Sequence, residues 1–274
     1  WHECNHSSLD FDSTSCQESS IRGFKWFPYA KGGTFRRWNG NLEYVVNWEN
    51  NGYEVKNFVD ENGKQRSRPQ NTAFYFKECL TYSAITSGKY SLRYLNKSIF
   101  GGGGDAIHMN NIDDIYYYLA FMNTSIAQSY LRIISPTLNF EVDHIKSIPI
   151  ILKKNDSITE LCKSNIVMSR RDWDAHETSW DFQENELIRL VCKGNPQQLA
   201  DVMESYKAVW TANFLKLHAN EEELNRQFIE IYGLQDELTP DVPLEEVTIL
   251  QKGEISIEDG EIVWHEDIVI KQLI

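Results

Sequence analysis

The chain has 274 residues, of which 41% are hydrophobic and 12% aromatic, and its formal net charge is −13. This composition excludes wholesale disorder, and since no apolar run reaches about 18 residues, a transmembrane helix is excluded as well. The length predicts two units. Five widely spaced cysteines indicate reduced thiols in a cytoplasmic protein, and the opening Trp-His-Glu, without Met, indicates a piece of a longer protein.

Charge is distributed unevenly along the chain. Residues 22–100 hold 13 Lys and Arg against 6 Asp and Glu, which is a net charge of +7, whereas the rest of the chain carries the opposite sign. The same segment is rich in Trp, Tyr and Phe. A basic segment in an acidic protein is typical of a face that binds a polyanion, and cations mixed with rings and amides suit nucleic acid.

The first half of the chain has the texture of a mixed α/β domain. Residues 1–21 are polar and serine-rich and are expected to form a linker from a missing upstream domain. Short alternating stretches then predict strands at 42–46 and 53–58. Asparagine–glycine turn signals occur at 50–52 and 61–63, and Pro69 makes residues 67–71 a loop.

A run of glycines separates this part from helical sequence. Gly101–Gly104 predicts a hinge, and a helix is expected from Asn111, its N-cap, to about residue 134, where Pro136 ends it. The elements expected after it are an edge strand at 148–152, a helix opening at Ser157, helices at 196–218 and 220–233, and a hairpin within 247–274. The predicted class is α+β, with a mixed α/β domain at 22–152 and a mostly helical domain at 153–274.

Motifs for catalysis are missing from the sequence. Gly101-x-Gly103-x-x-Ala106 loosely resembles a cofactor-binding turn, but the helix starts about ten residues late and no acidic strand end follows, so a flexible or tightly packed turn is favoured. No nucleophile elbow, Walker A loop or His-Glu-x-x-His occurs, and the cysteines and histidines lack metal-ligand spacing. Asn195-Pro196 is followed by Gln197, so it is not an Asn-Pro-Pro-Tyr loop. We therefore predict no catalytic, cofactor-binding or metal-binding residue in this chain.

Three basic clusters are candidates for DNA contact, at residues 31–38, 64–71 and 86–94. Glycines in the first permit close approach to a phosphate, and the second combines arginines with amides suited to guanine and adenine. Taken singly, each cation is more often solvated surface, but three clusters together favour DNA. The predicted contacts are Lys31, Arg36, Arg37, Arg66, Arg68, Lys89 and Arg93, with Gln70 and Asn71 as possible adenine readers. This prediction requires the cations to converge on one surface, free of ion pairs with carboxylates of the helical half.

Several long motifs resemble one family, the PglX-type adenine-specific DNA methyltransferases of BREX phage-defence systems. They are the stretches 24–38, 43–52, 66–72, 81–94, 173–182, 220–226 and 231–238. The block 119–150 is similar to the close of a recognition domain in type I restriction specificity subunits. Together the resemblance covers about residues 22–250.

The resemblance implies a target-recognition-like DNA-binding domain at 22–152 and a helical spacer or brace at 153–274. An S-adenosylmethionine-dependent catalytic domain would lie upstream in the same chain, so no catalytic residue carries over to this part. The expected partners are double-stranded DNA, that upstream domain and other defence-system proteins, with no membrane. The alternative is a protein–protein interaction module that does not read DNA directly; a fusion carrying a nuclease is a third possibility, but no nuclease motif is visible.

Overall fold

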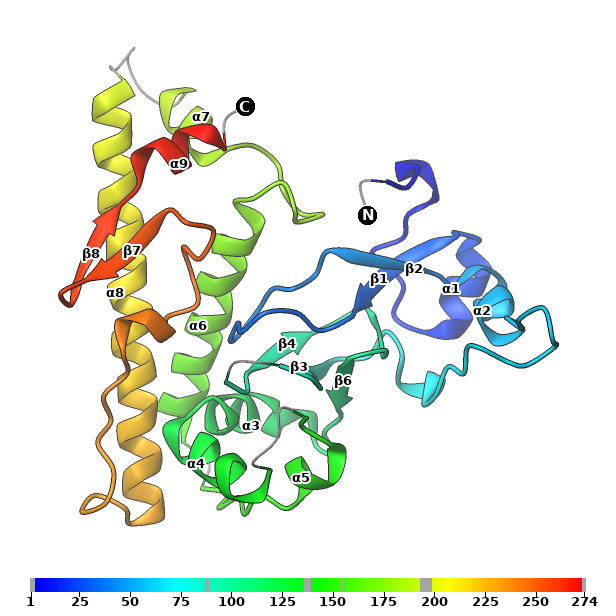
Figure 1. Cartoon of the computed structure of the whole chain (residues 1–274), viewed down its shortest axis with the longest axis horizontal. Helices are drawn as coiled ribbons and strands as arrows, with labels where there is room; N and C mark the ends of the chain where they lie inside the picture. The colour runs from blue at the N-terminus through cyan, green and yellow to red at the C-terminus, as the bar shows by residue number, and fades with distance from the viewer. Residues whose placement is uncertain (1–2, 87–88, 136–138, 154, 193–198, 273–274) are drawn as a thin grey trace. The chain divides into compact units, whose positions relative to one another are not determined.

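A computed structural model describes residues 3–86, 89–135, 139–153, 155–192 and 199–272 (Figure 1). The chain divides into two compact units. Unit 1 comprises Trp1–Arg36, Asn41–Ile115 and Ser135–Lys146, and unit 2 comprises Arg37–Gly40, Tyr116–Ile134 and Ser147–Ile274. Helices and small sheets are both present, so the predicted α+β class is confirmed. In the described part of the chain, no helix is both long enough and apolar enough to span a bilayer.

Unit 1 is built on two three-stranded sheets. One has the order β2-β1-β5 and the other the order β4-β3-β6. Strand β1 pairs antiparallel with β2 and parallel with β5, and β3 pairs antiparallel with both neighbours. The bounds are β1 Trp26–Ala30, β2 Tyr44–Asn47, β3 Cys79–Ser83, β4 Leu92–Leu95, β5 Ile99–Phe100 and β6 Gly104–Ile107. The expected strand at 42–46 is therefore present as β2.

The core of unit 1 is aromatic. Phe27, Trp48, Tyr75, Phe76 and Ile99 form one buried cluster. The edge of one ring meets the face of the next, with 5.6 Å between the centroids of Phe27 and Phe76 and 5.1 Å between those of Trp48 and Tyr75. Such pairs add about 0.5–1.5 kcal/mol each to the burial of their area. Many of the aromatics in the basic segment are thus core residues.

The prediction of a strand at 53–58 is wrong, because residues 53–56 belong to a short helix, α2. The helices of unit 1 are η1 His6–Ser8, α1 Cys16–Arg22, α2 Glu49–Lys56, η2 Thr72–Phe74, η3 Ile112–Asp114 and α5 Val142–Lys146. Inside α2, Asn50, Asn51 and Gly52 adopt left-handed backbone angles. A side chain at Gly52 would come within 2.5 Å of the Trp48 ring. Packing on Trp48 therefore overrides the alternating pattern that suggested a strand.

Gly101–Gly104 is a tight turn between β5 and β6, in agreement with the packed turn that the sequence favours over a cofactor-binding turn, but it is not a hinge that leads into a helix. The Gly101 amide donates to the Gly104 carbonyl at 3.0 Å. A side chain at Gly104 would lie 2.5 Å from the Ala30 carbonyl oxygen, and one at Gly32 would lie 2.6 Å from the Gly103 carbonyl oxygen. Both glycine motifs are therefore explained by backbones that pack against each other.

Unit 2 is mostly helical. Its elements are α3 Ile115–Met122, α4 Ser125–Ile134, α6 Asp156–Asp174, α7 Glu186–Cys192, α8 Leu199–Tyr232, η4 Leu244–Glu246, β7 Ile255–Glu258, β8 Glu261–Trp264 and α9 Glu266–Lys271. Strands β7 and β8 form the expected hairpin, confined to residues 255–264. Asn155 caps α6 by accepting from the Ser157 amide, so the helix begins slightly before the predicted residue.

The helix expected at 111–134 is interrupted. Asn111 accepts from the Asp113 amide, as expected of a cap, but it opens η3. Thr124 then separates α3 from α4, because its hydroxyl donates to the Phe121 carbonyl at 2.6 Å and accepts from the Ala127 amide at 3.4 Å. Pro136, the expected stop, lies outside the described residues. Since α3 and α4 belong to unit 2, this division differs from the expected domain at 22–152, whose role stays a prediction.

Residues 148–152 form no strand within the described chain. Two tyrosine hydroxyls bind this backbone instead: Tyr232 donates to the Pro149 carbonyl and accepts from the Ile151 amide, while Tyr117 donates to the Ile151 carbonyl at 2.6 Å. Tyr232 of α8 packs on the ring of Phe121, and Tyr117 of α3 packs on the ring of Phe228. Side-chain hydrogen bonds thus replace the partner strand that the sequence suggested.

The two helices expected at 196–218 and 220–233 are one continuous helix, α8. Asn220, expected to start a new helix, is buried and donates to Asn165 of α6 at 2.8 Å. Glu221, the next residue, is buried and paired with Arg37. Gly233, with a φ of 68°, ends the helix as predicted. Residues 196–198 of the expected helix lie outside the described residues.

A buried acid–imidazole pair lies in unit 2. The Glu254 carboxylate is 2.6 Å from His176 Nε2 and accepts from Gln272 at 3.0 Å. Burial raises the pKa of Glu254, but the hydrogen bond and charge of His176 outweigh it, so the pKa falls to about 2. Burial lowers the pKa of His176, but the hydrogen bond that the imidazole donates to Glu254 and the charges of Asp172 and Glu254 raise it above its ordinary value of 6.5.

The pair predicts a defined pH dependence of stability. The lowered pKa of Glu254 stabilises the folded state fully above the ordinary value of 4.5, and this stabilisation is lost as the pH falls towards about 2. The raised pKa of His176 stabilises the folded state fully below 6.5, and this stabilisation is lost as the pH rises through the raised value. The pair should stabilise most between these two ordinary values. The free energy of unfolding in urea should fall between about pH 5.5 and about pH 8.5, and we expect this fall to be smaller in His176→Gln than in the wild type. Equal losses in the two proteins would contradict this.

Candidate nucleic-acid interface

Unit 1 holds a cavity of about 560 Å³ beside the second basic cluster. One side of it is formed by the segment 66–71, and the other by rings and backbone of the β2-β1-β5 sheet and the glycine turn. The lining residues are Tyr29, Val46, Trp48, Val55, Arg66, Ser67, Arg68, Pro69, Gln70, Asn71, Tyr75, Ile99, Phe100, Gly101, Gly102 and Asp105. Volumes of this order are typical of sites that take a small organic group.

A closed loop positions the segment 66–71. After α2 the chain forms an extended loop that folds back on itself, and Figure 1 shows this loop beyond α2. The Arg66 amide donates to the Phe58 carbonyl at 2.9 Å, and residues 59 and 65 form a β-bridge. At the tip, the Asp60 carboxylate accepts from the Asn62 and Lys64 amides. The predicted turn at 61–63 is therefore present.

Asp60 also holds Arg66. The Arg66 guanidinium lies 2.7 Å from the Asp60 carboxylate. The hydrogen bond from the Lys64 amide, followed by those from Asn62 and Arg66, lowers the pKa of Asp60 although partial desolvation opposes it. An ionised Asp60 keeps both the turn and Arg66 in place, so the next residues leave the loop in a fixed direction.

Three polar side chains stand at the rim of the cavity. Arg68, Gln70 and Asn71 are exposed, and among the described residues none of their side chains makes a hydrogen bond or ion pair. Asn71 adopts a left-handed conformation with a φ of 55°, and its carbonyl accepts from the Phe74 amide. Asparagine tolerates this conformation better than most residues. The rim thus presents one guanidinium and two amides towards solvent.

Aromatic rings form the opposite wall. Tyr29 and Phe100 are half-buried, while Trp48 and Tyr75 lie beneath them, with the Tyr75 and Phe100 centroids 5.1 Å apart. The Tyr29 hydroxyl donates to the Gly101 carbonyl at 2.6 Å. Burial, with the neighbouring Tyr29 and Cys16, raises the pKa of Tyr75 to about 12, so this ring stays neutral. A neutral ring wall beside a polar rim can hold a flat, unsaturated group.

The structure brings together four of the nine predicted contacts. Arg66, Arg68, Gln70 and Asn71 line the same cavity. Lys31 is exposed at the end of β1, with its amine 4.8 Å from the centre of the Tyr44 ring. The side chain of Lys89 is partly buried, and residues 87–88 before it lie outside the described chain.

Arg36 and Arg93 are buried in unit 1. Their exposed fractions are 5% and 1%. The Arg93 guanidinium donates to the Arg36 carbonyl at 3.2 Å and to Ser83 Oγ at 3.3 Å, and burial lowers its pKa to about 10. Ser83 Oγ also accepts from the Gly33 amide, so the backbone donor that a phosphate would need is already used. These arginines therefore organise the fold of unit 1.

Arg37 is buried in unit 2. Its guanidinium lies 2.6 Å from Glu221 and 2.9 Å from Glu246, and only 4% of the residue is exposed. The indole of Trp38 donates to the same Glu221 carboxylate at 2.6 Å. Ser169 of α6 donates to the carbonyls of Arg37 and Asn39. Residues 37–40 are thus fixed by carboxylates of the helical part. Because the Arg37 guanidinium is already paired with two of these carboxylates, the structure argues against a contact between Arg37 and a phosphate.

Two parts of the cavity were missed by the sequence analysis. Phe100 and Asp105 flank the glycine turn, for which the sequence predicts a hinge or a packed turn but no part in a binding site. The glycine run itself was the signal that could have found them, because glycine is needed where the backbone lies close to another group. Gly102 has a φ of 65°, and a side chain there would lie 2.6 Å from the Tyr29 hydroxyl. That contact places the turn against an aromatic wall.

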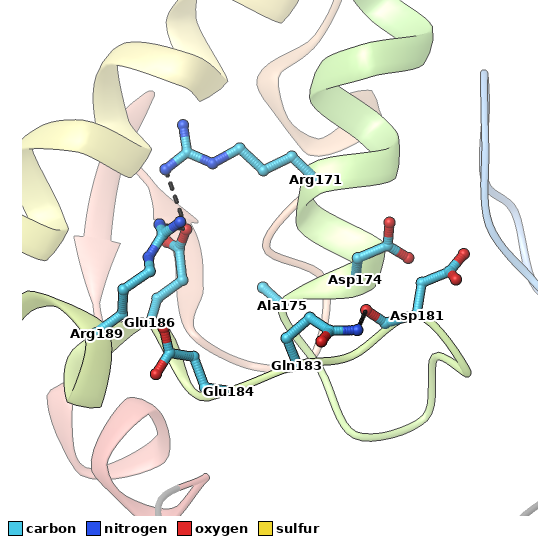
Figure 2. Close-up of a pocket in the computed structure, with 8 residues that line it drawn as sticks. All are labelled: Arg171, Asp174, Ala175, Asp181, Gln183, Glu184, Glu186 and Arg189. Carbon is cyan, nitrogen blue, oxygen red and sulfur yellow. Dashed lines mark hydrogen bonds and ion pairs between the residues drawn. The ribbon is translucent and has the colours of Figure 1, made fainter.

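A second cavity, of about 470 Å³, lies in unit 2 (Figure 2). It is lined by Arg171, Asp174, Ala175, Asp181, Gln183, Glu184, Glu186 and Arg189. Both arginines donate to the Glu186 carboxylate, and Trp210 donates to its other oxygen at 2.6 Å. The lining holds four carboxylates, and both of its arginines are already bonded to one of them, so this cavity does not suit a phosphate. Among the described residues, no group of three or more acidic, His or Cys side chains could hold a metal ion.

Two adenine-specific methyltransferases are similar to this chain. PglX of Lacticaseibacillus casei (strain Zhang) is 36% identical over 252 residues, which are 91% of this chain and 21% of that protein. BrxX of Escherichia coli O9:H4 (strain HS) is 34% identical over an alignment of 283 positions, which covers 98% of this chain and 22% of that protein. The chain thus spans about a fifth of the length of either relative. No protein-family model matches it.

Arg37 should contribute to stability rather than to binding. Arg37→Met leaves the buried Glu221 without its guanidinium, and breaking a buried pair typically costs about 3–5 kcal/mol. We expect the midpoint of urea unfolding to fall sharply and the double variant Arg37→Met/Glu221→Gln to recover part of the loss. Arg170→Ala, which removes an exposed arginine of α6, is the matched control and should change stability by less than about 0.5 kcal/mol. An unchanged midpoint in Arg37→Met would contradict this assignment.

Proposed function

Because this chain is homologous to one part of the PglX and BrxX adenine-specific methyltransferases, we propose that it is the DNA-recognition region of such an enzyme in a phage-defence system of the BREX type. Unit 1 binds duplex DNA with the loop 57–71 and the rim of its cavity. The observation that carries the proposal is the gathering of Arg66, Arg68, Gln70 and Asn71 around one cavity.

The chemistry of the rim supports DNA as the partner. A guanidinium binds a phosphate or guanine, and the amides of Gln and Asn can pair with the edge of adenine. Lys64, Arg66 and Arg68 follow one another along the exposed side of a single loop, which a curved phosphate backbone can track.

The favourable field in unit 1 is local. Unit 1 holds 13 basic against 15 acidic residues, a net charge of −2, whereas unit 2 holds 14 against 25, a net charge of −11. Unit 1 as a whole therefore does not attract a polyanion, but the exposed cations of its loop do so at short range, within a Debye length of about 8 Å. Binding should then be strongly salt-dependent and limited to this loop and its surroundings.

Methyl transfer belongs, in this proposal, to an upstream domain of the same chain that binds S-adenosylmethionine, in a cytoplasmic enzyme. Unit 2 would brace the recognition unit and offer its acidic surface to other proteins of the defence system. The competing proposal is an interaction module that binds proteins and reads no DNA. The strongly negative charge of unit 2 favours that role for unit 2, so the two proposals differ in what unit 1 binds.

Salt dependence distinguishes the two proposals. We expect the 274-residue chain to bind a mixed-sequence duplex of about 30 base pairs with an affinity that falls steeply with salt. Arg68→Ala should weaken binding and reduce the slope of log K against log salt by about one. Arg170→Ala removes an arginine of unit 2 that is also exposed, and it should leave affinity and slope unchanged.

Fluorescence anisotropy over a salt series provides the measurement. If Arg68→Ala and Arg170→Ala have the same effect, the loop is not the DNA-binding surface. If the wild-type chain shows no salt-dependent binding but retains a protein partner in a pull-down, the interaction module is the better account.

A further inference from the structure

We infer that the cavity of unit 1 receives one nucleobase that has been unstacked from the DNA, while the rim residues hold the strand beside it. This inference rests on the proposed function and names the part of the DNA that the cavity takes. It arises from three features: a wall of rings, an interior without excess positive charge, and polar rim groups without partners in the described chain.

The wall suits a flat aromatic ring. Tyr29 and Phe100 present half-buried rings to the cavity, and both are held from behind, Phe100 by the edge contact with Tyr75 and Tyr29 by its hydrogen bond to Gly101. Fixed rings lose little conformational freedom when another ring stacks on them. Stacking of bases on aromatic side chains is the usual way in which proteins hold single-stranded nucleotides.

The charge of the cavity favours a neutral group over a phosphate or a cation. Of the charged residues that line it, Arg66 is paired with Asp60, and Arg68 and Asp105 carry opposite charges. A phosphate inside would approach the Asp105 carboxylate, and a cation would approach the two arginines. A base carries no charge, and its amino group or ring nitrogens can bond to a carboxylate or an amide.

The rim carries groups that can bind the phosphate beside an unstacked base and the polar edge of the base itself. Arg68 is exposed at the edge, where it can bind the phosphate next to an unstacked base. Gln70 and Asn71 are two consecutive amides with four donor and acceptor groups between them, all available in the described structure. The opposite edge is formed by Gly101 and Gly102, whose lack of side chains leaves the backbone open to close approach.

A bulged duplex tests the inference, because it supplies an unstacked base at little cost. The 274-residue chain would be titrated with three DNAs of the same sequence: a fully paired duplex, a duplex with a one-nucleotide bulge, and a duplex in which that bulged nucleotide lacks its base. We expect the bulge with a base to bind about tenfold more tightly than the bulge without one, which is the scale of one stacked base.

Two variants connect this difference to the cavity. Gln70→Ala/Asn71→Gly removes both amides, and glycine keeps the left-handed backbone at position 71. We expect this variant to lose the part of the preference that comes from amide hydrogen bonds to the edge of the base, while it retains the salt slope of duplex binding. Gln17→Ala/Asn50→Gly is the matched control, since both residues are exposed in unit 1, away from the cavity lining, and Asn50 also has a left-handed φ of 50°. It should behave like the wild type.

Each outcome decides something different. Equal affinities for the bulges with and without a base, with salt-dependent duplex binding intact, would overturn the inference and leave the proposed function standing. A base preference that is undiminished in Gln70→Ala/Asn71→Gly would place the base elsewhere and also overturn it. Binding to none of the three DNAs would overturn both the inference and the proposed function.

Discussion

The cost of removing a charged guanidinium from water determines how the basic segment is used. A buried arginine requires either a carboxylate or several carbonyl and hydroxyl acceptors, and the chain provides both: Glu221 and Glu246 for Arg37, the Arg36 carbonyl and Ser83 for Arg93. Arg66 and Arg68 remain in water on a loop. The arginines thus separate into those that build the units and those that can meet a partner, and only the second group defines a surface.

The sequence predicted a good deal of the fold where local chemistry decides. The α+β class, the turn at Gly63, the end of α8 at Gly233 and the hairpin of β7 and β8 follow from patterns a few residues long. It failed where a distant residue decides. The Asn220–Glu223 stretch has the composition of a helix start, but Asn165 and Arg37 give Asn220 and Glu221 partners inside a continuous helix.

The candidate site was predicted in part for the same reason. Arg66, Arg68, Gln70 and Asn71 are adjacent in sequence, so a local motif was sufficient to find them. Arg36, Arg37 and Arg93 belong to motifs of equal appearance, and only the tertiary structure shows that they are enclosed. Composition cannot separate a solvated arginine from a buried one, because the carboxylates that receive Arg37 lie more than 180 positions away.

The continuity of α8 has a consequence for how related chains can vary in length. Asn220 and Glu221 are fixed against α6 and residues 37–40, and two turns later Phe228 and Tyr232 are fixed against α3. One inserted residue between these anchor points would rotate everything beyond it by about 100°, which would turn one set of partners to the wrong side. Related chains are therefore expected to keep a constant number of residues in the interval 221–228.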